Sequence, residues 1–255
     1  MSKKTATVPP PPKLIPYDKE GEHYYITDEI EVNTALAPIV HGRIGFDTEF
    51  YDNPDKLNAK ILAELTPSGV PWKRVKLCTV QVAVIGAVYV INIKKMQAFP
   101  AELRRLLASD DVLKVGVGLA ADGKVIWDGV AAYVQHFVDV GLMIKYANPE
   151  LYENKDQNPL SLKCCVAQAL NKALNKGPRR DNWNSKLTHE QIKYAALDAQ
   201  ASLQVYDKAV ELLEAQAKRL GRPVPEDWYK FDFRAGVPTR HGVSARNFKV
   251  TTGKD

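Results

Sequence analysis

Apolar residues in the first half of the chain fall into short, β-branched runs that turn residues separate. The pattern predicts a strand over residues 43–50 and two more over residues 76–85 and 87–93, which are broken at Gly86. Strands joined by so short a turn pair as a hairpin, so we expect three antiparallel strands. Residues 51–75 form a long connection, in which leucine and isoleucine recur at the spacing of one short helix.

Helical periodicity begins after Pro100, which opens a predicted helix over residues 101–108. An apolar strand over residues 112–117 runs into a second helix over residues 120–128, and a short strand follows at residues 137–140. Three antiparallel strands followed by alternating helices and strands predict an α/β protein. Its mixed sheet should contain first antiparallel and then parallel strands, with helices on both faces.

A long helix is predicted to begin after Thr188 and to end near Leu213. Thr188 and Gln191 have the spacing of a capping box, in which each side chain bonds the backbone N–H of the other residue. The helix carries a stripe of apolar and small residues that we expect to face the core. The stripe consists of Ile192, Ala196, Ala199, Leu203, Tyr206 and Val210.

The composition is that of an ordinary globular protein, since 45% of the 255 residues are hydrophobic and 25% are charged. The longest apolar run, residues 78–93, is short and contains Gln81, so no membrane-spanning helix is expected. The N-terminus has no apolar signal segment, and we expect a nuclear or cytoplasmic protein. Three cysteines, two of them adjacent, fit neither a disulfide framework nor a metal site and are expected to be buried thiols.

Charge and composition divide the chain into three parts. Residues 1–22 are rich in proline and lysine and are expected to be disordered, and residues 23–215 form the expected folded domain. Residues 216–255 form an extension with nine basic and four acidic residues, which equals the net charge of +5 for the whole chain. Its aromatic residues favour packing of at least part of it on the domain. Because the rest of the chain is balanced in charge, a uniformly basic nucleic-acid binder is disfavoured.

Asp47 and Glu49 lie two residues apart in the first predicted strand, so their side chains share one face. Two carboxylates side by side repel each other, and a divalent cation is the natural compensation. The spacing alone is also compatible with an edge strand whose acidic face is solvated.

Two further aspartates stand in notable positions. Asp122 follows a buried strand and two glycines at the start of a predicted helix, but Ala121 replaces the third glycine of a dinucleotide-binding fingerprint. Tyr194 and Asp198 are four residues apart in the long helix and share one face, beside alanines that permit close packing. Taken singly, Asp122 is compatible with a helix cap and Asp198 with a solvated helix face.

The order and type of these segments resemble the DEDDy-type 3′–5′ exonucleases. This family includes RNase D, the proofreading domain of bacterial DNA polymerase I and the exonuclease domain of the Werner syndrome protein. The resemblance covers about residues 24–215 and is closest to the Werner-type branch. The matching segments are residues 46–50 (FDTEF), 116–122 (GVGLAAD) and 194–199 (YAALDA), with further agreement at 77–81 (LCTVQ), 182–183 (NW) and 187–191 (LTHEQ).

The resemblance implies a ribonuclease-H-like fold and hydrolysis of phosphodiester bonds from the 3′ ends of DNA or RNA, with release of nucleoside 5′-monophosphates. It also implies two Mg²⁺ or Mn²⁺ ions, which all-oxygen ligands suit. Asp47 would bridge both ions, and Glu49 and Asp198 would complete the ion site that activates water. Asp122 would hold the second ion, and Tyr194 would orient the water. The alternative is a catalytically weak nucleic-acid-binding or scaffold module with the same fold.

The partner that this resemblance implies is single-stranded or 3′-recessed nucleic acid, and no residue distinguishes DNA from RNA. A basic loop before the last motif would grip phosphates, and a loop after the first motif would stack on a base. A solvated loop and a core tryptophan are the respective alternatives. Targeting would depend on a partner protein or on the basic extension. The candidate contacts are Lys176, Arg179, Arg180, Asn182 and Trp183 in the first loop and Trp72, Lys73 and Arg74 in the second.

Overall fold

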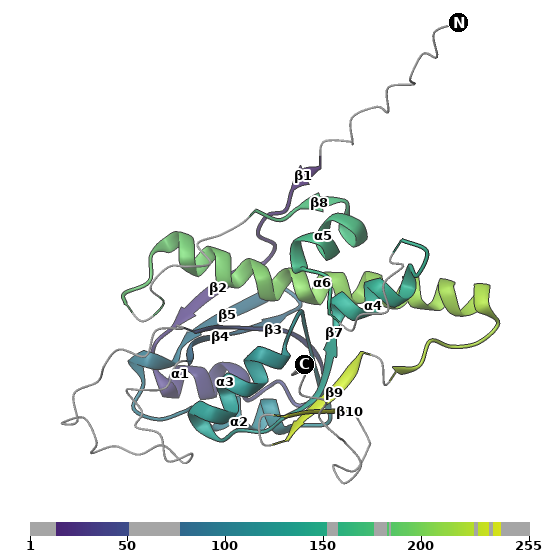
Figure 1. Cartoon of the computed structure of the whole chain (residues 1–255). Helices are drawn as coiled ribbons and strands as arrows, with labels where there is room; N and C mark the ends of the chain where they lie inside the picture. Colours follow the sequence, from purple (N-terminus) through teal and green to yellow (C-terminus); the bar gives the residue numbers. More distant parts are fainter. Residues whose placement is uncertain are drawn as a thin grey trace, which may run out of the picture.

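An eight-stranded mixed sheet forms the centre of the fold (Figure 1). The computed structural model of the chain describes residues 14–50, 77–151, 158–175, 183, 185–226, 229–234 and 237–240. From one edge of the sheet to the other, the strands are β10 (Val237–Arg240), β9 (Lys230–Arg234), β7 (Val134–Asp139), β6 (Val112–Gly116), β3 (Gly42–Phe50), β4 (Leu77–Val84), β5 (Ala87–Asn92) and β2 (Glu22–Ile26).

The strand directions confirm the expected mixed sheet. Strand β4 pairs antiparallel with both β3 and β5, as the hairpin pattern predicted. On the other side of β3, strands β6 and β7 continue the sheet in parallel. Strand β2 joins β5 in parallel, and β9 and β10 extend the sheet in antiparallel fashion beyond β7. Strand β3 therefore lies in the interior of the sheet, between an antiparallel and a parallel neighbour.

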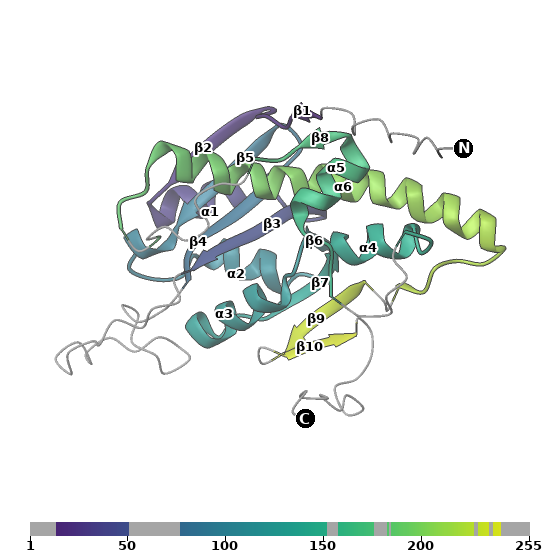
Figure 2. The same cartoon turned by 45° about the horizontal axis from the view of Figure 1, so that its top comes forward.

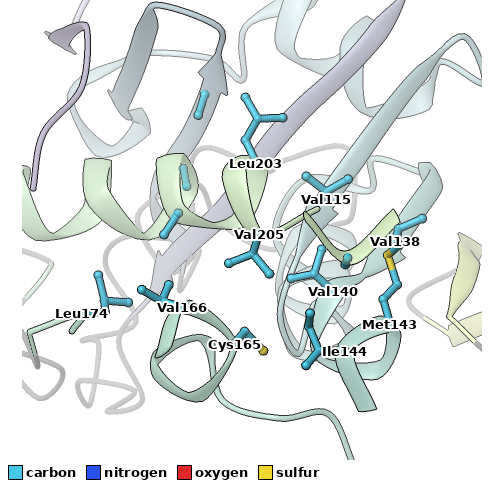
Figure 3. Close-up of a cluster of buried hydrophobic side chains, with 14 of the residues drawn as sticks. Val115, Val138, Val140, Met143, Ile144, Cys165, Val166, Leu174, Leu203 and Val205 are labelled. Atoms are coloured by element: carbon cyan, nitrogen blue, oxygen red, sulfur yellow. The ribbon is translucent and has the colours of Figure 1, made fainter. Parts of the chain in front are cut away.

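Helices cover both faces of this sheet (Figure 2). One face carries α1 (Glu29–Leu36), α2 (Ala101–Ala108) and α3 (Ala120–Val130), and the other carries α4 (Val140–Ala147), α5 (Leu162–Leu170) and α6 (His189–Leu220). A short 3-10 turn (Ile93–Lys95) follows β5. The core divides accordingly into two apolar clusters, one on each side. Figure 3 shows part of the cluster between the sheet and helices α4, α5 and α6. In it, Val115 and Val138 from the sheet meet Ile144, Val166 and Val205 from these helices.

Helix α6 begins at a start signal in its sequence and ends at a stop signal. Both hydrogen bonds of the predicted capping box between Thr188 and Gln191 are present. The helix continues beyond the expected Leu213 and ends at Gly221, whose φ of 68° is easy for glycine. The predicted stripe does face the core, but burial is broader than one stripe. Because α4, α5 and the N-terminal segment pack on its outer side, residues such as Val205 are buried as well.

The folded part of the chain begins at an earlier residue than the sequence predicted. Residues 14–22, which we expected to be disordered, contain β1 (Ile15–Pro16), which pairs in parallel with β8 (Lys172–Ala173). Tyr17 is only 3% exposed, because its ring packs beside α6. The sequence did not reveal this contact, because a short proline-rich segment carries no periodic pattern.

Strands β9 and β10 confirm that part of the basic extension packs on the domain, since both belong to the sheet. The expected domain limit at residue 215 falls inside α6. The predicted helix within residues 51–75 lies outside the described residues. Among the helices that the structure describes, none combines the length and apolar character that crossing a membrane requires. Of the three cysteines, which form no disulfide, Cys78 and Cys165 are buried as expected, whereas Cys164 is only half-buried.

Candidate active site

Strand β3 presents Asp47 and Glu49 on the face of the sheet that α6 covers. Gly45, two residues earlier on the same face, allows this close approach, because a Cβ there would lie 2.0 Å from the carbonyl oxygen of Ala199. The helix backbone therefore rests almost directly on the strand, and Asp198 comes down beside the two strand carboxylates. Oxygen atoms of Asp47, Glu49 and Asp198 all lie within 4.8 Å of one another.

Asp122 reaches the same region from the other side of the strand. Strand β6 passes through Gly116 and Gly118 into α3, and a Cβ on Gly116 would lie 2.6 Å from the carbonyl oxygen of Phe46. Thr48, which points away from its two acidic neighbours, donates a hydrogen bond from its hydroxyl to Asp122 Oδ1. Asp122 is 6% exposed. The structure thus brings three predicted ligands into one set, and Thr48 links the fourth to the same strand.

Two of these carboxylates, Asp47 and Asp122, do not ionise easily. Burial is the main cause that raises the pKa of Asp47 well above its ordinary value, and the charges of Asp122, Asp198 and Glu49 raise it further. Burial raises the pKa of Asp122 to about 6, although the hydrogen bond from Thr48 works against this rise. A cluster of buried acids is costly when charged, and bound divalent cations offset that cost with the all-oxygen ligands they prefer. The donor set therefore fits Mg²⁺ or Mn²⁺.

Tyr194 lies one turn before Asp198 on α6 and is half-buried. The centre of its ring lies 6.4 Å from the ring of Trp183, with the planes tilted by 38°. Trp183 is only 2% exposed, so its ring offers no face for a nucleic-acid base in this conformation. The role of Trp183 as a nucleic-acid contact stays a prediction, and in this conformation its ring packs beside Tyr194. Tyr194 is the tyrosine that was predicted to orient water.

The other candidate substrate contacts stay predictions. They all lie outside the described residues: Lys176, Arg179, Arg180, Asn182, Trp72, Lys73 and Arg74.

Two site residues escaped the sequence reasoning, Thr48 and Asp139. Thr48 stands between the two acidic residues of the first motif, and only knowledge of what lies across the strand reveals its bond to Asp122. Asp139 is 5% exposed and accepts a hydrogen bond from the backbone N–H of Gly118, 2.9 Å away. The position of Asp139 before an apolar run is typical of a helix cap. Its bond to Gly118 could not be predicted in this way, because Gly118 is distant in sequence.

Three carboxylates on one patch, with a fourth beside them and a phenol on the next turn, match what metal-dependent phosphodiester hydrolysis requires of a protein. Residues 24–214 match the family of 3′-5′ exonuclease domains, which is most of the chain.

Individual relatives agree with this match. The mouse bifunctional 3′-5′ exonuclease/ATP-dependent helicase WRN is 33% identical over 149 residues, which make up 57% of this chain and 10% of the mouse protein. This chain thus spans far less than two thirds of that relative. The solved catalytic core of RRP6 from Trypanosoma brucei is similar in fold, with a TM-score of 0.60 at 17% identity, covering 80% of this chain and 50% of that one. Brucella melitensis NrnC, solved with bound Mg²⁺, has a TM-score of 0.53 at 18% identity, covering 81% of this chain and 85% of that one. The site and the match over residues 24–214 together lead to one conclusion: this chain belongs to the 3′-5′ exonuclease family, and it is of the DEDDy type.

Proposed function

We propose that this protein is a metal-dependent 3′–5′ exonuclease that removes nucleoside 5′-monophosphates from the 3′ ends of DNA or RNA. The observation that carries the proposal is the convergence of Asp47, Glu49 and Asp198 within 4.8 Å of one another. Carboxylates at such distances repel one another unless cations or protons occupy the site. Family membership supports the reaction class, and the NrnC structure with Mg²⁺ supports the choice of metal.

A described residue can be assigned to each chemical task of this reaction. Asp47 and Glu49 project from β3 toward α6 and, with Asp198, would hold the divalent cations, while Asp122 would complete the set from α3. When bound, two such cations lower the pKa of a water molecule and offset charge on the attacking and leaving oxygens of an in-line displacement. Tyr194 holds its phenol one turn from Asp198, where it would orient the attacking water.

The substrate in this proposal is a single-stranded or 3′-recessed end. Asp47 and Glu49 are half-buried and Asp198 is 9% exposed, so a scissile phosphate must enter below the surface. A free 3′ end enters such a site more easily than a paired duplex does, because base pairs need not be broken first. The family resemblance does not distinguish a DNA substrate from an RNA substrate. Only contacts to the 2′-hydroxyl would make the site select one of them.

The experiment follows release of labelled nucleotides from single-stranded DNA, recessed duplex DNA and RNA, each with Mg²⁺, Mn²⁺ or EDTA. We expect activity with metal, none with EDTA, and at least a hundredfold loss in Asp198→Asn. The matched control is Asp207→Asn on the same helix, since Asp207 is exposed and its ion pair with Arg43, at 2.7 Å, lies on the surface. Full activity in Asp198→Asn would disprove the assignment. Binding of the nucleic acid without metal-dependent degradation would instead favour the scaffold alternative.

A further inference from the structure

The turn that leads into α3, the helix that carries Asp122, provides no side-chain cap for that helix. Leu119 occupies the N-cap position and makes no side-chain hydrogen bond to the helix. Gly118, just before it, has a φ of +69°, a left-handed conformation that glycine adopts easily. A contact from outside the turn would hold this conformation and, with it, the place of Asp122 beside Thr48.

Asp139 supplies that contact from the end of the neighbouring strand. It is the register partner of Gly116 across the parallel pair of β6 and β7, so its side chain lies beside the turn. Its Oδ2 accepts a hydrogen bond from the backbone N–H of Gly118 at 2.9 Å. Its own backbone N–H donates to the carbonyl oxygen of Tyr229 at 2.9 Å, which fixes the residue from the other side.

The other oxygen of Asp139 has a separate task. Oδ1 accepts from the backbone N–H groups of Gly141 at 2.9 Å and Leu142 at 3.1 Å, and so caps α4. A cap needs one oxygen, and serine or asparagine serves equally well. The carboxylate thus has one oxygen more than capping requires, and that oxygen is the one that bonds the Gly118 turn.

Asp139 also shares the electrostatic environment of the site. Burial raises its pKa to about 6 against the effect of its three backbone hydrogen bonds, and the charge of Asp122 contributes to the rise. A second acid beside the ligand cluster adds repulsion, so capping alone would be served better by a neutral residue. The arrangement therefore calls for a function of the second oxygen.

We propose that Asp139 is a positioning residue for Asp122: by holding the backbone N–H of Gly118, it fixes the turn before α3 and so sets the place of the Asp122 carboxylate. It is not itself a metal ligand. The effect of Asp139 on catalysis rests on the proposed function, whereas the effect of Asp139 on the turn does not.

The test uses Asp139→Asn and Asp139→Ser in the full chain. In asparagine, the side-chain oxygen can cap α4, but the amide NH₂ then faces the N–H of Gly118 and cannot accept from it. Serine keeps the cap and is too short to reach the turn. The matched control is Asp28→Asn, because Asp28 caps α1 through a 3.0 Å bond from Glu31 and follows the edge strand β2, which β5 and β4 separate from β3.

Two readouts separate the proposal from a merely structural role. In metal-free protein, we expect amide hydrogen exchange at residues 118–122 to become about tenfold faster in both Asp139 variants, as loss of a charge-assisted hydrogen bond predicts. Calorimetric titration should show Mg²⁺ or Mn²⁺ binding weakened several-fold, with kcat reduced and KM for the nucleic acid unchanged. Asp28→Asn should change none of these quantities.

Exchange and metal binding equal to those of the wild-type protein would overturn the proposal. An equal loss of protection across α4 in both variants would also overturn it, since that result means that only the cap was lost. If the wild-type protein shows no metal-dependent exonuclease activity, the proposed function fails, and the exchange data still decide whether Asp139 holds the turn.

Discussion

Two helices bring carboxylates to strand β3, and they are held in place in different ways. Helix α6 has 32 residues, a complete capping box and a glycine C-cap, and it lies close enough to β3 to require Gly45. Helix α3 has 11 residues and no side-chain cap. Its position depends on Asp139 at one end of its turn and on Phe233 beneath it. The limits of α6 therefore follow from its own sequence, and close packing on β3 holds it, whereas the position of α3 follows from contacts with its turn and with the C-terminal extension.

The contact beneath α3 comes from the C-terminal hairpin of β9 and β10 (Figure 2). Gly123 lies directly over the ring of Phe233, because a Cβ at this position would be 2.5 Å from the Phe233 Cγ. Phe233 in turn stacks on Phe137, with 4.7 Å between ring centres and 14° between planes. The basic extension, whose aromatic residues favoured packing on the domain, thus supports the helix that carries Asp122.

Phe233→Ala should have the largest effect on stability. The side chain is 2% exposed, and replacing a buried phenylalanine by alanine costs about 3–5 kcal/mol. We expect urea unfolding to show a loss of that size, together with weaker metal binding, since α3 loses its support. The control is Phe231→Ala on the same strand, because Phe231 is half-buried and its ring lies 5.5 Å from that of Phe137. An equal or larger loss for Phe231→Ala would contradict this account.

The second-largest effect is the change in stability with pH and metal removal that Asp122 on α3 should cause. Burial raises the pKa of Asp122 from 3.8 to about 6, so the folded protein holds a proton there that the unfolded chain has released. The contribution of Asp122 to the stability of the metal-free protein should therefore be greatest below about pH 4. This contribution should be lost as the pH rises through about 6. A shift of this size corresponds to about 3 kcal/mol, and Asp47 acts in the same direction.

Excess Mg²⁺ at pH 7.5 should restore that stability, because it binds the folded state alone. Thermal unfolding with EDTA and with Mg²⁺ at pH 5 and 7.5 measures both effects. Asp122→Asn should flatten the pH dependence, and Asp207→Asn should not. A metal-free wild-type protein whose stability increases from pH 5 to 7.5 would show that this assignment of protons is wrong.

How much of the molecule the sequence predicts depends on whether the information is local. The helix over residues 101–108 was predicted within its observed limits, because its amphipathic pattern and Pro100 define it locally. Strand β2 was missed, since its sequence EHYYI is mostly exposed and pairs at the edge of the sheet. Helix α4 was missed because it follows β7 without a break and is almost entirely buried.

The same distinction applies to the site. Asp47, Glu49 and Asp198 were predictable, since strand and helix periodicity fixes which face each side chain occupies. The roles of Thr48 and Asp139 depend on which turn lies across the sheet, and periodicity carries no such information. The burial of Trp183 was unpredictable for the same reason, because its contact with Tyr194 joins a loop to a helix.

On the α6 side, the informative variant is Gly45→Ala. The added methyl group would meet the backbone of α6 at 2.0 Å, so the helix or the strand must move. Overpacking of this kind costs about 1–3 kcal/mol. Because Asp198 lies one residue before the clash, we expect activity to fall more than a hundredfold even where the protein is fully folded.

The control for this variant lowers the stability of α6 without displacing it. Gly221→Ala strains the C-cap, where φ is +68°, but its Cβ would meet no atom within 4 Å. We expect a loss of about 1 kcal/mol in urea unfolding and unchanged kcat at temperatures where both variants are folded. Equal activity in the two variants would mean that the distance between α6 and β3 does not limit catalysis.

The smallest effect tests whether α6 also depends on a distant segment. The Tyr17 hydroxyl donates to Gln204 Oε1 at 3.0 Å and accepts from Gln200 Nε2 at 2.9 Å, which ties the N-terminal segment to the outer side of α6. Tyr17→Phe keeps the buried ring and should cost about 1 kcal/mol. Amide exchange should become faster in residues 15–23, while kcat stays within about twofold, since the packing at Gly45 holds α6 independently of this segment. Tyr24→Phe, at a side chain that is 46% exposed, is the control and should change neither quantity. A fall in kcat of more than tenfold in Tyr17→Phe would show that α6, like α3, is positioned by a remote part of the chain, and the contrast between the two helices would then be lost.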